Sequence, residues 1–272
     1  MIPRPAPFCL TVSDQGSFIV NRNDACIVPG GTFGVGHQLF QTSSFDRMQI
    51  DFVKALLGWR RHHFGDGVVA LDCGANIGVC TVEWAKFMAG WGQIHAFEAQ
   101  EFIFYALGGN IALNNCLNAS ARHCALDSKN GRLRIPQLDL NKNASFGSLE
   151  LKQLERAEYI GQSVDYGTDK TIEVEALALD SLSLPRVDLI KIDVEGMEMD
   201  VLQGTVDTLR RLKPIVWIEV LKSNADEIER FLCGLGYDEA TQLGSDALVF
   251  HSDDPTRLHC RTEGDQFLID TL

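Results

Sequence analysis

The amino-acid sequence predicts an α/β protein built around a doubly wound, mostly parallel sheet. The strongest observation is the stretch at residues 68–78, where an apolar run leads into an acid, a glycine-rich turn and a helical pattern. In addition, short apolar runs alternate with helical patterns as far as residue 220. The chain has 272 residues, 45% hydrophobic and 22% charged, which suits one large domain with a short N-terminal addition, although two small domains also fit.

The N-terminal addition, residues 1–65, is predicted to be a small β/α unit that serves as a cap or an interface. Strands at 8–12 and 17–20 flank the turn Asp14-Gln15-Gly16. Residues 29–36 are rich in glycine and are predicted to form a loop. A helix follows, and apolar side chains at helical spacing predict that its buried face carries Phe45, Met48, Phe52 and Leu56.

The main domain is predicted over residues 66–252, with an insertion at about 128–178 and a tail at 253–272. Its fourth strand, at residues 187–193, is nearly continuous in apolar residues, as a strand covered on both faces should be. The parallel strands are expected at residues 68–72, 93–98, 121–126, 187–193 and 215–220, and a closing antiparallel pair at 236–241 and 246–251, on either side of Leu243-Gly244-Ser245.

Three further elements are predicted inside this domain. The helix after Gly78 should direct Val79, Val82, Ala85 and Met88 into the core. Residues 171–177 of the insertion alternate in polarity, which is typical of an edge strand. A helix at 223–232 should begin with a Ser-x-x-Asp cap at Ser223.

Charge and cysteine usage argue against several classes of protein. The net charge of −13 disfavours a protein that wraps nucleic acid, because phosphate binding needs a basic surface. No stretch approaches ~18 consecutive apolar residues, so we expect no membrane span. The eight cysteines include no C-x-x-C pair, which predicts free thiols in a reducing, cytoplasmic setting and no metal site.

The glycine-rich turn indicates which ligand the first strand serves. Gly74 and Gly78 allow a sharp turn and a close approach of the ligand, and Glu98, at the end of the second strand, can accept hydrogen bonds from both ribose hydroxyls. This spacing fits NAD and S-adenosylmethionine equally. Asp72 would repel a pyrophosphate, and Asn76 replaces the middle glycine and would crowd one. The two residues therefore favour S-adenosylmethionine, whose ammonium group Asp72 would attract.

Acidic residues at the ends of the fourth and fifth predicted strands form the second candidate group. Asp193 and Glu195 follow the fourth strand, and Glu219 ends the fifth. Open α/β sheets bind ligands at the carboxyl ends of their strands. Beside a methyl donor, these carboxylates could deprotonate or orient a hydroxyl nucleophile, so all three are catalytic candidates.

Six segments follow one another along the chain: residues 71–78, 96–98, 110–114, 125–127, 179–182 and 190–198. The most distinctive are Gly-Ala-Asn-Ile-Gly at 74–78 and Asp-Val-Glu-Gly at 193–196. Over residues 66–220 the sequence resembles the FkbM family of S-adenosylmethionine-dependent methyltransferases. The resemblance implies a Rossmann-like class I methyltransferase sheet. One departure is Ala99 after Glu98, where the family usually has proline.

The resemblance also implies a role for each matched position. Glu98 would hold the ribose, and Asp193 and Glu195 would face the methyl group and the acceptor, with Asp193 also on the cofactor side. The methionine end of the cofactor would be shaped by the turn residues Asp72, Gly74, Ala75, Asn76 and Gly78. The adenine contacts would fall at Ala125, Leu126 and Asp127.

We therefore expect a methyltransferase that uses S-adenosylmethionine, releases S-adenosylhomocysteine and methylates a hydroxyl of a small metabolite or sugar. N-methylation with the same cofactor site stays open, and His37 or His251 are alternative general bases. An NAD-dependent oxidoreductase is a weaker alternative, because Asp72 and Asn76 disfavour the pyrophosphate of NAD. A binding module without activity is disfavoured by the acids at the strand ends. The acceptor, the metal dependence and the oligomeric state, a homo-oligomer included, stay open.

Overall fold

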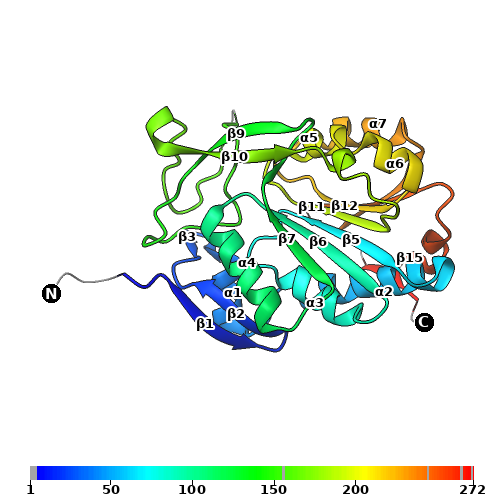
Figure 1. The fold of residues 1–272 in the computed structure, drawn as a ribbon, viewed down its shortest axis with the longest axis horizontal. Coiled ribbons are helices and arrows are strands. Elements are labelled where there is room, and N and C mark those ends of the chain that lie inside the picture. Colours follow the sequence, from blue (N-terminus) through cyan, green and yellow to red (C-terminus); the bar gives the residue numbers. More distant parts are fainter. Residues whose placement is uncertain (1–4, 155–156, 244, 264–265, 271) are drawn as a thin grey trace.

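The computed structural model describes residues 5–154, 157–243, 245–263, 266–270 and 272. At its centre is a seven-stranded sheet (Figure 1). The strands are β5 (Val68–Cys73), β6 (Gly92–Glu98), β7 (Ala119–His123), β11 (Leu189–Ile192), β12 (Ile215–Glu219), β13 (Tyr237–Leu243) and β14 (Asp246–His251). In space their order is β13-β14-β12-β11-β5-β6-β7.

The directions of these strands confirm the predicted fold class. From β12 to β7 all neighbouring strands are parallel. β14 runs antiparallel between β12 and β13, which is the predicted closing pair. Gly244, predicted in the turn of that pair, lies outside the described residues.

Helices cover both faces of the sheet (Figure 1). On one face lie α2 (Arg47–Phe64), α3 (Val79–Phe87) and α4 (Glu101–Leu113), and on the other lie α5 (Glu198–Gln203), α6 (Val206–Leu212) and α7 (Ala225–Cys233). Because side chains alternate along a strand, Val68 and Ala70 of β5 join the first core, whereas Val69 and Leu71 join the second. The predicted inner face of α3, with Val79, Val82, Ala85 and Met88, is buried and confirmed.

The order of the strands reverses between β5 and β11. From β5 the chain adds β6 and β7 on one side, and it later returns to add β11 and β12 on the other. At such a point the helices after neighbouring strands leave on opposite faces, so a crevice opens beyond the carboxyl ends of the strands. The residues predicted to be functional follow β5, β6, β11 and β12 and therefore converge here.

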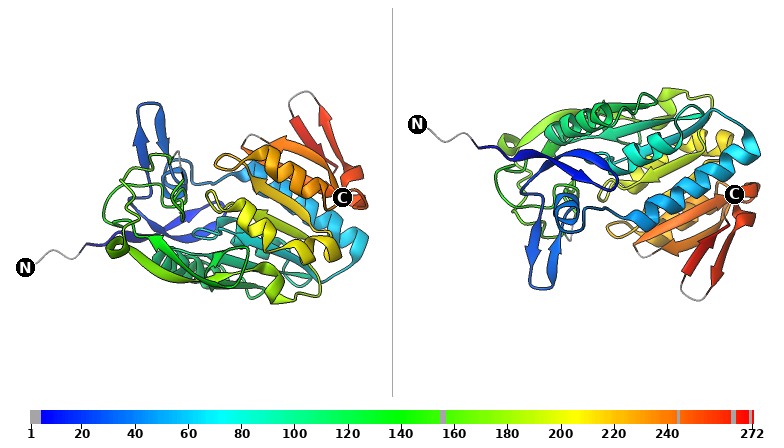
Figure 2. Two further views of the ribbon diagram at one scale, coloured as in Figure 1. Left: turned by 90° about the horizontal axis from the view of Figure 1, so that it is seen from above. Right: turned by 90° about the horizontal axis from the view of Figure 1, so that it is seen from below.

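Before the sheet, the chain forms β1 (Phe8–Ser13), β2 (Gly16–Asn21), β3 (Cys26–Val28), β4 (Gly31–Phe33) and α1 (Val35–Thr42). β1 and β2 are the predicted hairpin. The prediction of a loop at 29–36 is wrong in part, because β4 pairs with β3 and α1 begins at Val35. Gly31 and Gly34 have φ of 154° and 142°, so here glycine allows turns between short elements. Figure 2 shows the β3–β4 hairpin projecting from the body of the molecule.

The predicted inner face of α2 is wrong at Met48, which is 87% exposed. The buried apolar side chains of this helix are instead Ile50, Val53 and Leu57, with Leu56 as predicted, and Phe45 and Phe52 are partly buried against the core. The helix begins only at Arg47, after Asp46 in a left-handed conformation. Phe45 therefore lies outside the helix, and helical spacing cannot place it on one face with Met48.

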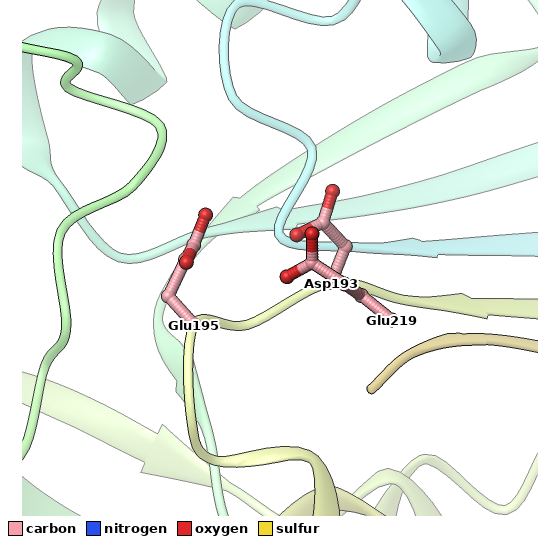
Figure 3. Close-up of side chains that lie close together, drawn as sticks. All are labelled: Asp193, Glu195 and Glu219. Carbon is pink, nitrogen blue, oxygen red and sulfur yellow. The ribbon is translucent and has the colours of Figure 1, made fainter. Parts of the chain in front are cut away.

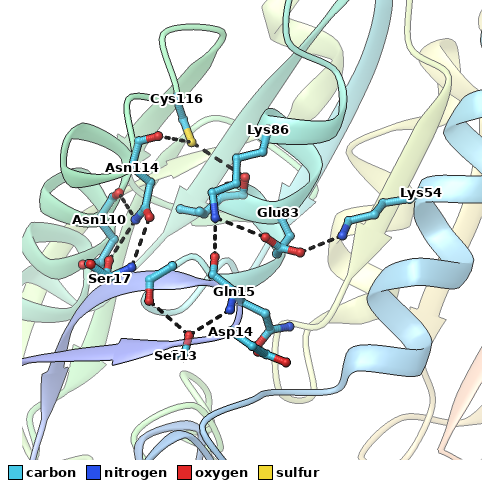
Figure 4. Close-up of polar contacts among 12 residues, drawn as sticks. Ser13, Asp14, Gln15, Ser17, Lys54, Glu83, Lys86, Asn110, Asn114 and Cys116 are labelled. Carbon is cyan, nitrogen blue, oxygen red and sulfur yellow. Dashed lines mark hydrogen bonds and ion pairs between the residues drawn. The ribbon is translucent and has the colours of Figure 1, made fainter.

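Asn110 of α4 and Asn114, which caps the end of that helix, bind the backbone of β2, and Figure 4 shows Asn114 beside Ser17. The Asn110 side chain accepts from the Ile19 amide at 2.6 Å and donates to the Ile19 carbonyl at 3.2 Å. Asn114 does the same at Ser17, at 3.2 and 2.8 Å. The two amide side chains therefore satisfy backbone groups along β2 as a neighbouring strand would.

The predicted strand at 121–126 is two strands. β7 ends at His123, and after Cys124 the chain enters β8 (Ala125–Leu126), which pairs with β10 (Thr171–Leu177). β10 also pairs with β9 (Gly131–Pro136), so the strand predicted at 171–177 exists, in a separate three-stranded sheet. The bend falls where the Cys124 amide donates to the Glu98 carbonyl, a contact between strands that sequence periodicity cannot reveal. Short 3-10 helices lie beside β10, at η1 (Thr168–Lys170) and η2 (Leu179–Leu182).

The start of α7 also differs from the prediction. The helix begins at Ala225, and the Asn224 side chain caps it by accepting from the Glu227 amide at 3.3 Å. Ser223 instead donates its hydroxyl to Glu198. Either residue type can cap a helix, so the sequence alone favours the wrong one.

The tail after β14 folds back onto α2 as η3 (Pro255–His259), β15 (Cys260–Glu263) and β16 (Gln266–Ile269). The buried guanidinium of Arg60 in α2 joins this tail to the sheet. The guanidinium donates to Asp188, just before β11, at 3.1 Å and to Asp254 of the tail at 2.8 Å. No helix in the described part of the chain combines the length and apolar character that a bilayer span requires.

Candidate functional site

A cavity of about 500 Å³ opens at the carboxyl ends of the strands. Its walls come from the turn after β5, the end of β6, β8, the ends of β11 and β12, helix α1 and residues 145–151. A smaller cavity of about 160 Å³ adjoins it and shares Gly74, Asn76, Asp193 and Glu219. The volume of the larger cavity suits a small organic ligand.

The turn after β5 needs glycine at the two predicted positions. Gly74 has φ of 80°, and a Cβ there would lie 1.8 Å from the Asp193 carbonyl oxygen. Gly78 has φ of 86°, and a Cβ there would lie 2.4 Å from Leu107 Cδ1. The first glycine thus lets the turn touch the end of β11, and the second lets α3 approach α4. Asn76, between them, is itself left-handed, with φ of 51°.

Glu98 lies at the edge of the cavity, where β6 ends, and is 6% exposed. Its carboxylate accepts from the Asn76 amide at 3.0 Å and from the Gln100 amide at 2.8 Å. Burial outweighs these hydrogen bonds and raises the pKa of Glu98 to about 7. Ala99, unlike a proline at this position, supplies a further backbone N–H near this carboxylate.

Asp72 is completely buried and lines the smaller cavity, as do Ala75 and Gly78. One carboxylate oxygen accepts from the Thr81 hydroxyl at 2.5 Å, and the other lies 3.9 Å from Lys191 Nζ without a hydrogen bond among the described residues. Burial raises the pKa of Asp72, although Lys191 and Thr81 oppose the shift. An orphaned buried oxygen beside a cavity is a suitable partner for a ligand ammonium.

The residues predicted to contact adenine separate into two groups. Ala125 and Leu126 are buried and line the larger cavity beside Phe97. Asp127 is not part of the lining of that cavity, and its carboxylate lies 3.4 Å from Lys152 Nζ. The structure thus brings the apolar pair to the cavity and leaves the acid outside it.

Three carboxylates face one another where β11 and β12 end (Figure 3). Asp193, Glu195 and Glu219 each place an oxygen within 4.8 Å of the other two, and all three line the larger cavity. Lys191 Nζ lies 2.8 Å from Asp193, and Lys222 Nζ lies 2.6 Å from Glu195. The three catalytic candidates are therefore brought together, with two lysines that balance part of their charge.

Two of the three carboxyl groups, Glu195 and Glu219, hold a proton more tightly than an ordinary glutamate does. Burial and repulsion from Asp193 raise the pKa of Glu195 to about 8, although Lys222 opposes the shift. Burial, Asp193 and Asp246 raise the pKa of Glu219 to about 7. Carboxylates that titrate near neutral pH can accept a proton from a substrate and release it to water.

The sequence contains no paired metal ligands, and its prediction of no metal site does not anticipate this cluster. The three oxygens are close enough together to hold one cation, and oxygen ligands suit Mg²⁺ or Ca²⁺. The two lysines compete with such an ion for the same negative charge. In the sequence, the one indication of such a carboxylate cluster is that all three acids stand at the ends of strands predicted to be neighbours.

Sequence reasoning missed several residues of the site. Lys222 is 7% exposed at its side chain and bonds to Ser148 as well as Glu195. Helix α1 supplies part of the cavity wall, including His37, so this candidate base lies in the cavity. The other candidate, His251, is buried beside Tyr237, outside the lining of the cavity, and accepts from the Asp253 amide.

Comparison with known proteins agrees with this geometry. Residues 72–239 match the model of the methyltransferase FkbM domain. The chain is 30% identical over 172 residues to "Methyltransferase 1" of Beauveria bassiana, covering 60% of this chain and 68% of that protein. It is 29% identical over 189 residues to "Methyltransferase sdnD" of Sordaria araneosa, covering 62% and 73%.

A solved structure shares part of the chain: the crystal structure of methyltransferase FkbM from Methylobacillus flagellatus, with 16% identity and a TM-score of 0.47. The match covers 68% of this chain and 43% of that one, so this chain spans less than half of that protein. The family model and the first relative decide the assignment, since each covers more than half of the chain. The chain belongs to the FkbM methyltransferase family.

Proposed function

We propose that the protein transfers the methyl group of S-adenosylmethionine to a hydroxyl of a small molecule, such as a sugar or another metabolite. The observation that carries the proposal is the single cavity that joins the β5 turn and Glu98 to the three carboxylates of β11 and β12. One side of this cavity suits the nucleoside, and the other offers bases for a hydroxyl.

The donor fits the residues on the first side. We name the turn at 73–78, Glu98, Ala125 and Leu126 the donor half. The Glu98 carboxylate can accept from the ribose hydroxyls, and the apolar pair can cover the adenine. The orphaned Asp72 oxygen in the adjoining cavity suits the ammonium of the methionine end. The surrounding acids favour a donor with a positively charged sulfur.

The other side suits the reaction itself. When bound, S-adenosylmethionine supplies an electrophilic methyl carbon on a sulfonium. The acceptor oxygen forms a bond to this carbon as the sulfur–carbon bond breaks, and the bonding pair returns to sulfur. The hydroxyl proton moves to the Glu195 or Glu219 carboxylate, which their raised pKa values favour near neutral pH. Fixed walls hold the acceptor at attack distance, which supplies much of the acceleration.

Donor binding is the first test. We expect S-adenosylhomocysteine to bind with micromolar affinity by isothermal titration calorimetry and NAD to show no binding. An analogue that carries an ammonium group where the methyl is transferred should bind about tenfold more tightly than S-adenosylhomocysteine, because it faces the carboxylates. The Glu219→Gln variant should lose most of this preference. Binding of NAD in place of S-adenosylhomocysteine would overturn the proposal.

The bond formed in the product distinguishes O-methylation from N-methylation. A panel of alcohols, phenols, sugars and amines, incubated with methyl-labelled donor, is analysed by mass spectrometry and NMR. We expect labelled ethers, and Glu195→Gln should lower turnover by more than tenfold while donor affinity changes little. Labelled amines without ethers would favour the N-methyltransferase.

We also propose that the protein works in the cytoplasm, on small molecules rather than nucleic acid or membranes. The eight cysteines are free in the structure, which supports a reducing setting. The net charge of −13 disfavours phosphate-rich partners. Localisation of a tagged chain by fluorescence microscopy tests this directly.

A further inference from the structure

Helix α1 forms part of the wall of the larger cavity. Three of its polar residues, His37, Gln38 and Gln41, line the cavity. Gln38 donates to Asp46 at 3.3 Å. Within the described chain, the His37 ring and the Gln41 amide make no hydrogen bond or ion pair, so both are available to a ligand. We name α1 and residues 145–151 the acceptor half.

A single buried carboxylate holds the two parts of the acceptor half together. Asp24 is 4% exposed, and it accepts from the Gly36 amide of α1 at 2.7 Å and from the Phe146 amide at 3.1 Å. Its own carbonyl accepts from the His37 amide at 2.8 Å. A Cβ at Gly36 would lie 2.8 Å from Asp24 Cβ, so the helix is packed directly on this anchor. The wall is therefore fixed in position before any ligand binds.

The charge of the cavity lining is negative when its carboxyl groups are ionised, which for Glu195 requires a pH above its raised pKa of about 8. Its described lining includes the carboxylates of Asp46, Glu98, Asp193, Glu195 and Glu219, and no lysine or arginine. Lys191 lines only the smaller adjoining cavity, Lys222 lines neither, and their ammonium groups are already paired with Asp193 and Glu195. An anionic ligand would therefore lose its hydration without finding a free cation.

We propose that the cavity accepts uncharged or cationic hydroxyl compounds and excludes carboxylated and phosphorylated ones, with His37 and Gln41 of α1 contacting the acceptor. This inference rests on the proposed function in one respect, namely that the ligand bound beside α1 is the methyl acceptor. The recognition itself depends only on the cavity. Uncharged amide and imidazole groups suit hydroxyls and carbonyls, and the carboxylates repel a further negative charge.

Matched ligands that differ only in charge test the proposal. The first set is benzyl alcohol, benzoate and benzylamine, and the second is glucose, glucuronate and glucosamine. Their affinities for the whole protein are measured by ligand-observed NMR at about pH 8.5, above the raised pKa values of Glu98, Glu195 and Glu219, with and without saturating S-adenosylhomocysteine. We expect the carboxylate of each set to bind at least about tenfold more weakly than the alcohol. Equal or tighter binding of the carboxylates, or no binding of any member at millimolar concentration, would overturn the proposal.

A charge placed on α1 tests where this selection occurs. In Gln41→Arg, affinity for benzoate should rise at least about fivefold and affinity for benzylamine should fall. Gln203→Arg is the matched control, because Gln203 is exposed at the end of α5 and outside both cavities. Equal effects of the two variants would overturn the role of α1. Because the ligands are also tested without S-adenosylhomocysteine, a failure of donor binding is seen separately from a failure of this inference.

Discussion

The donor half and the acceptor half of the cavity are fixed by different kinds of contact. In the donor half, neighbouring strands of one parallel sheet hold the turn: the Gly74 and Ala75 amides donate to the Phe97 carbonyl at 3.1 and 2.9 Å. In the acceptor half, the Asp24 carboxylate joins α1 to a loop 122 residues further along the chain. The first arrangement follows from the fold, whereas the second depends on a few side chains. We therefore expect the donor half to tolerate little change and the acceptor half to vary with the substrate.

The largest effect should come from Gly74→Ala. The new Cβ would collide with the Asp193 carbonyl and would add a left-handed strain, together costing about 4 kcal/mol in the free energy of unfolding. Gly90→Ala is the control, because Gly90 has a similar φ of 84° with nothing within 4 Å of its Cβ, and it should cost only about 1 kcal/mol. Denaturant unfolding measures both. Equal losses would mean that the approach of β5 to β11 is not tight.

A smaller effect is expected when Glu98 is changed. Glu98→Ala should raise the Kd of S-adenosylhomocysteine about 30-fold, because charged hydrogen bonds to the ribose are lost. Asp127→Ala should change it less than about threefold, since Asp127 is absent from the cavity lining. Isothermal titration of both variants separates the two acids predicted for the cofactor. A large loss in Asp127→Ala would restore that residue to the adenine site.

Asp24→Asn should weaken the acceptor half alone. One amide oxygen cannot accept in the way a carboxylate does from both Gly36 and Phe146, which should cost about 1 to 2 kcal/mol locally. We expect hydrogen exchange of the α1 amides to quicken about tenfold, with the Kd of S-adenosylhomocysteine within about twofold of wild type. Asp66→Asn, at an exposed ion pair with Arg61, is the control and should change neither. If the Kd of S-adenosylhomocysteine rises by the same factor as the exchange rate of the α1 amides, the two halves of the cavity are energetically coupled, which contradicts the prediction.

The smallest effect is a dependence of stability on pH. The folded protein raises the pKa of Glu98 and Glu219 to about 7 and of Glu195 to about 8, above their unfolded values near 4.5. Folding therefore favours the protonated forms, and the free energy of unfolding should fall as pH rises from about 5 to about 8. Thermal unfolding at several pH values measures how far the free energy of unfolding falls across this range. Glu195→Gln should make that fall smaller by on the order of 1 kcal/mol. An unchanged fall in this variant would contradict the raised pKa of Glu195.

The same contrast explains what the sequence could predict. The parallel strands, the glycine turn and the acids at the strand ends follow from local patterns, because strand polarity and the turn place them at one edge of the sheet. Asp193, Glu195 and Glu219 could therefore be grouped before any coordinates were known. Asp127 is predicted to contact the adenine with Ala125 and Leu126 because of its position in a motif, but its side chain faces Lys152.

The acceptor half could not be predicted, because its contacts join residues far apart in sequence. Asp24 stands in a stretch without a motif, and nothing there indicates a bond to Phe146. The glycines at 30–36 suggest a loop, although they allow a hairpin and a helix start. Lys222 lies just beyond β12, and its partner Glu195 belongs to a different loop. Long-range pairs of this kind leave no periodic signal.

The Arg60 ion pairs bear on how the chain matures during synthesis. Arg60 is made early, but its partner Asp254 follows 194 residues later. β12 likewise gains its neighbour β14 only when residues 246–251 have left the ribosome. Until then a buried cation lacks half of its partners and a central strand has an open edge, which invites pairing with other chains. We expect nascent chains that stall before residue 246 to depend on chaperones.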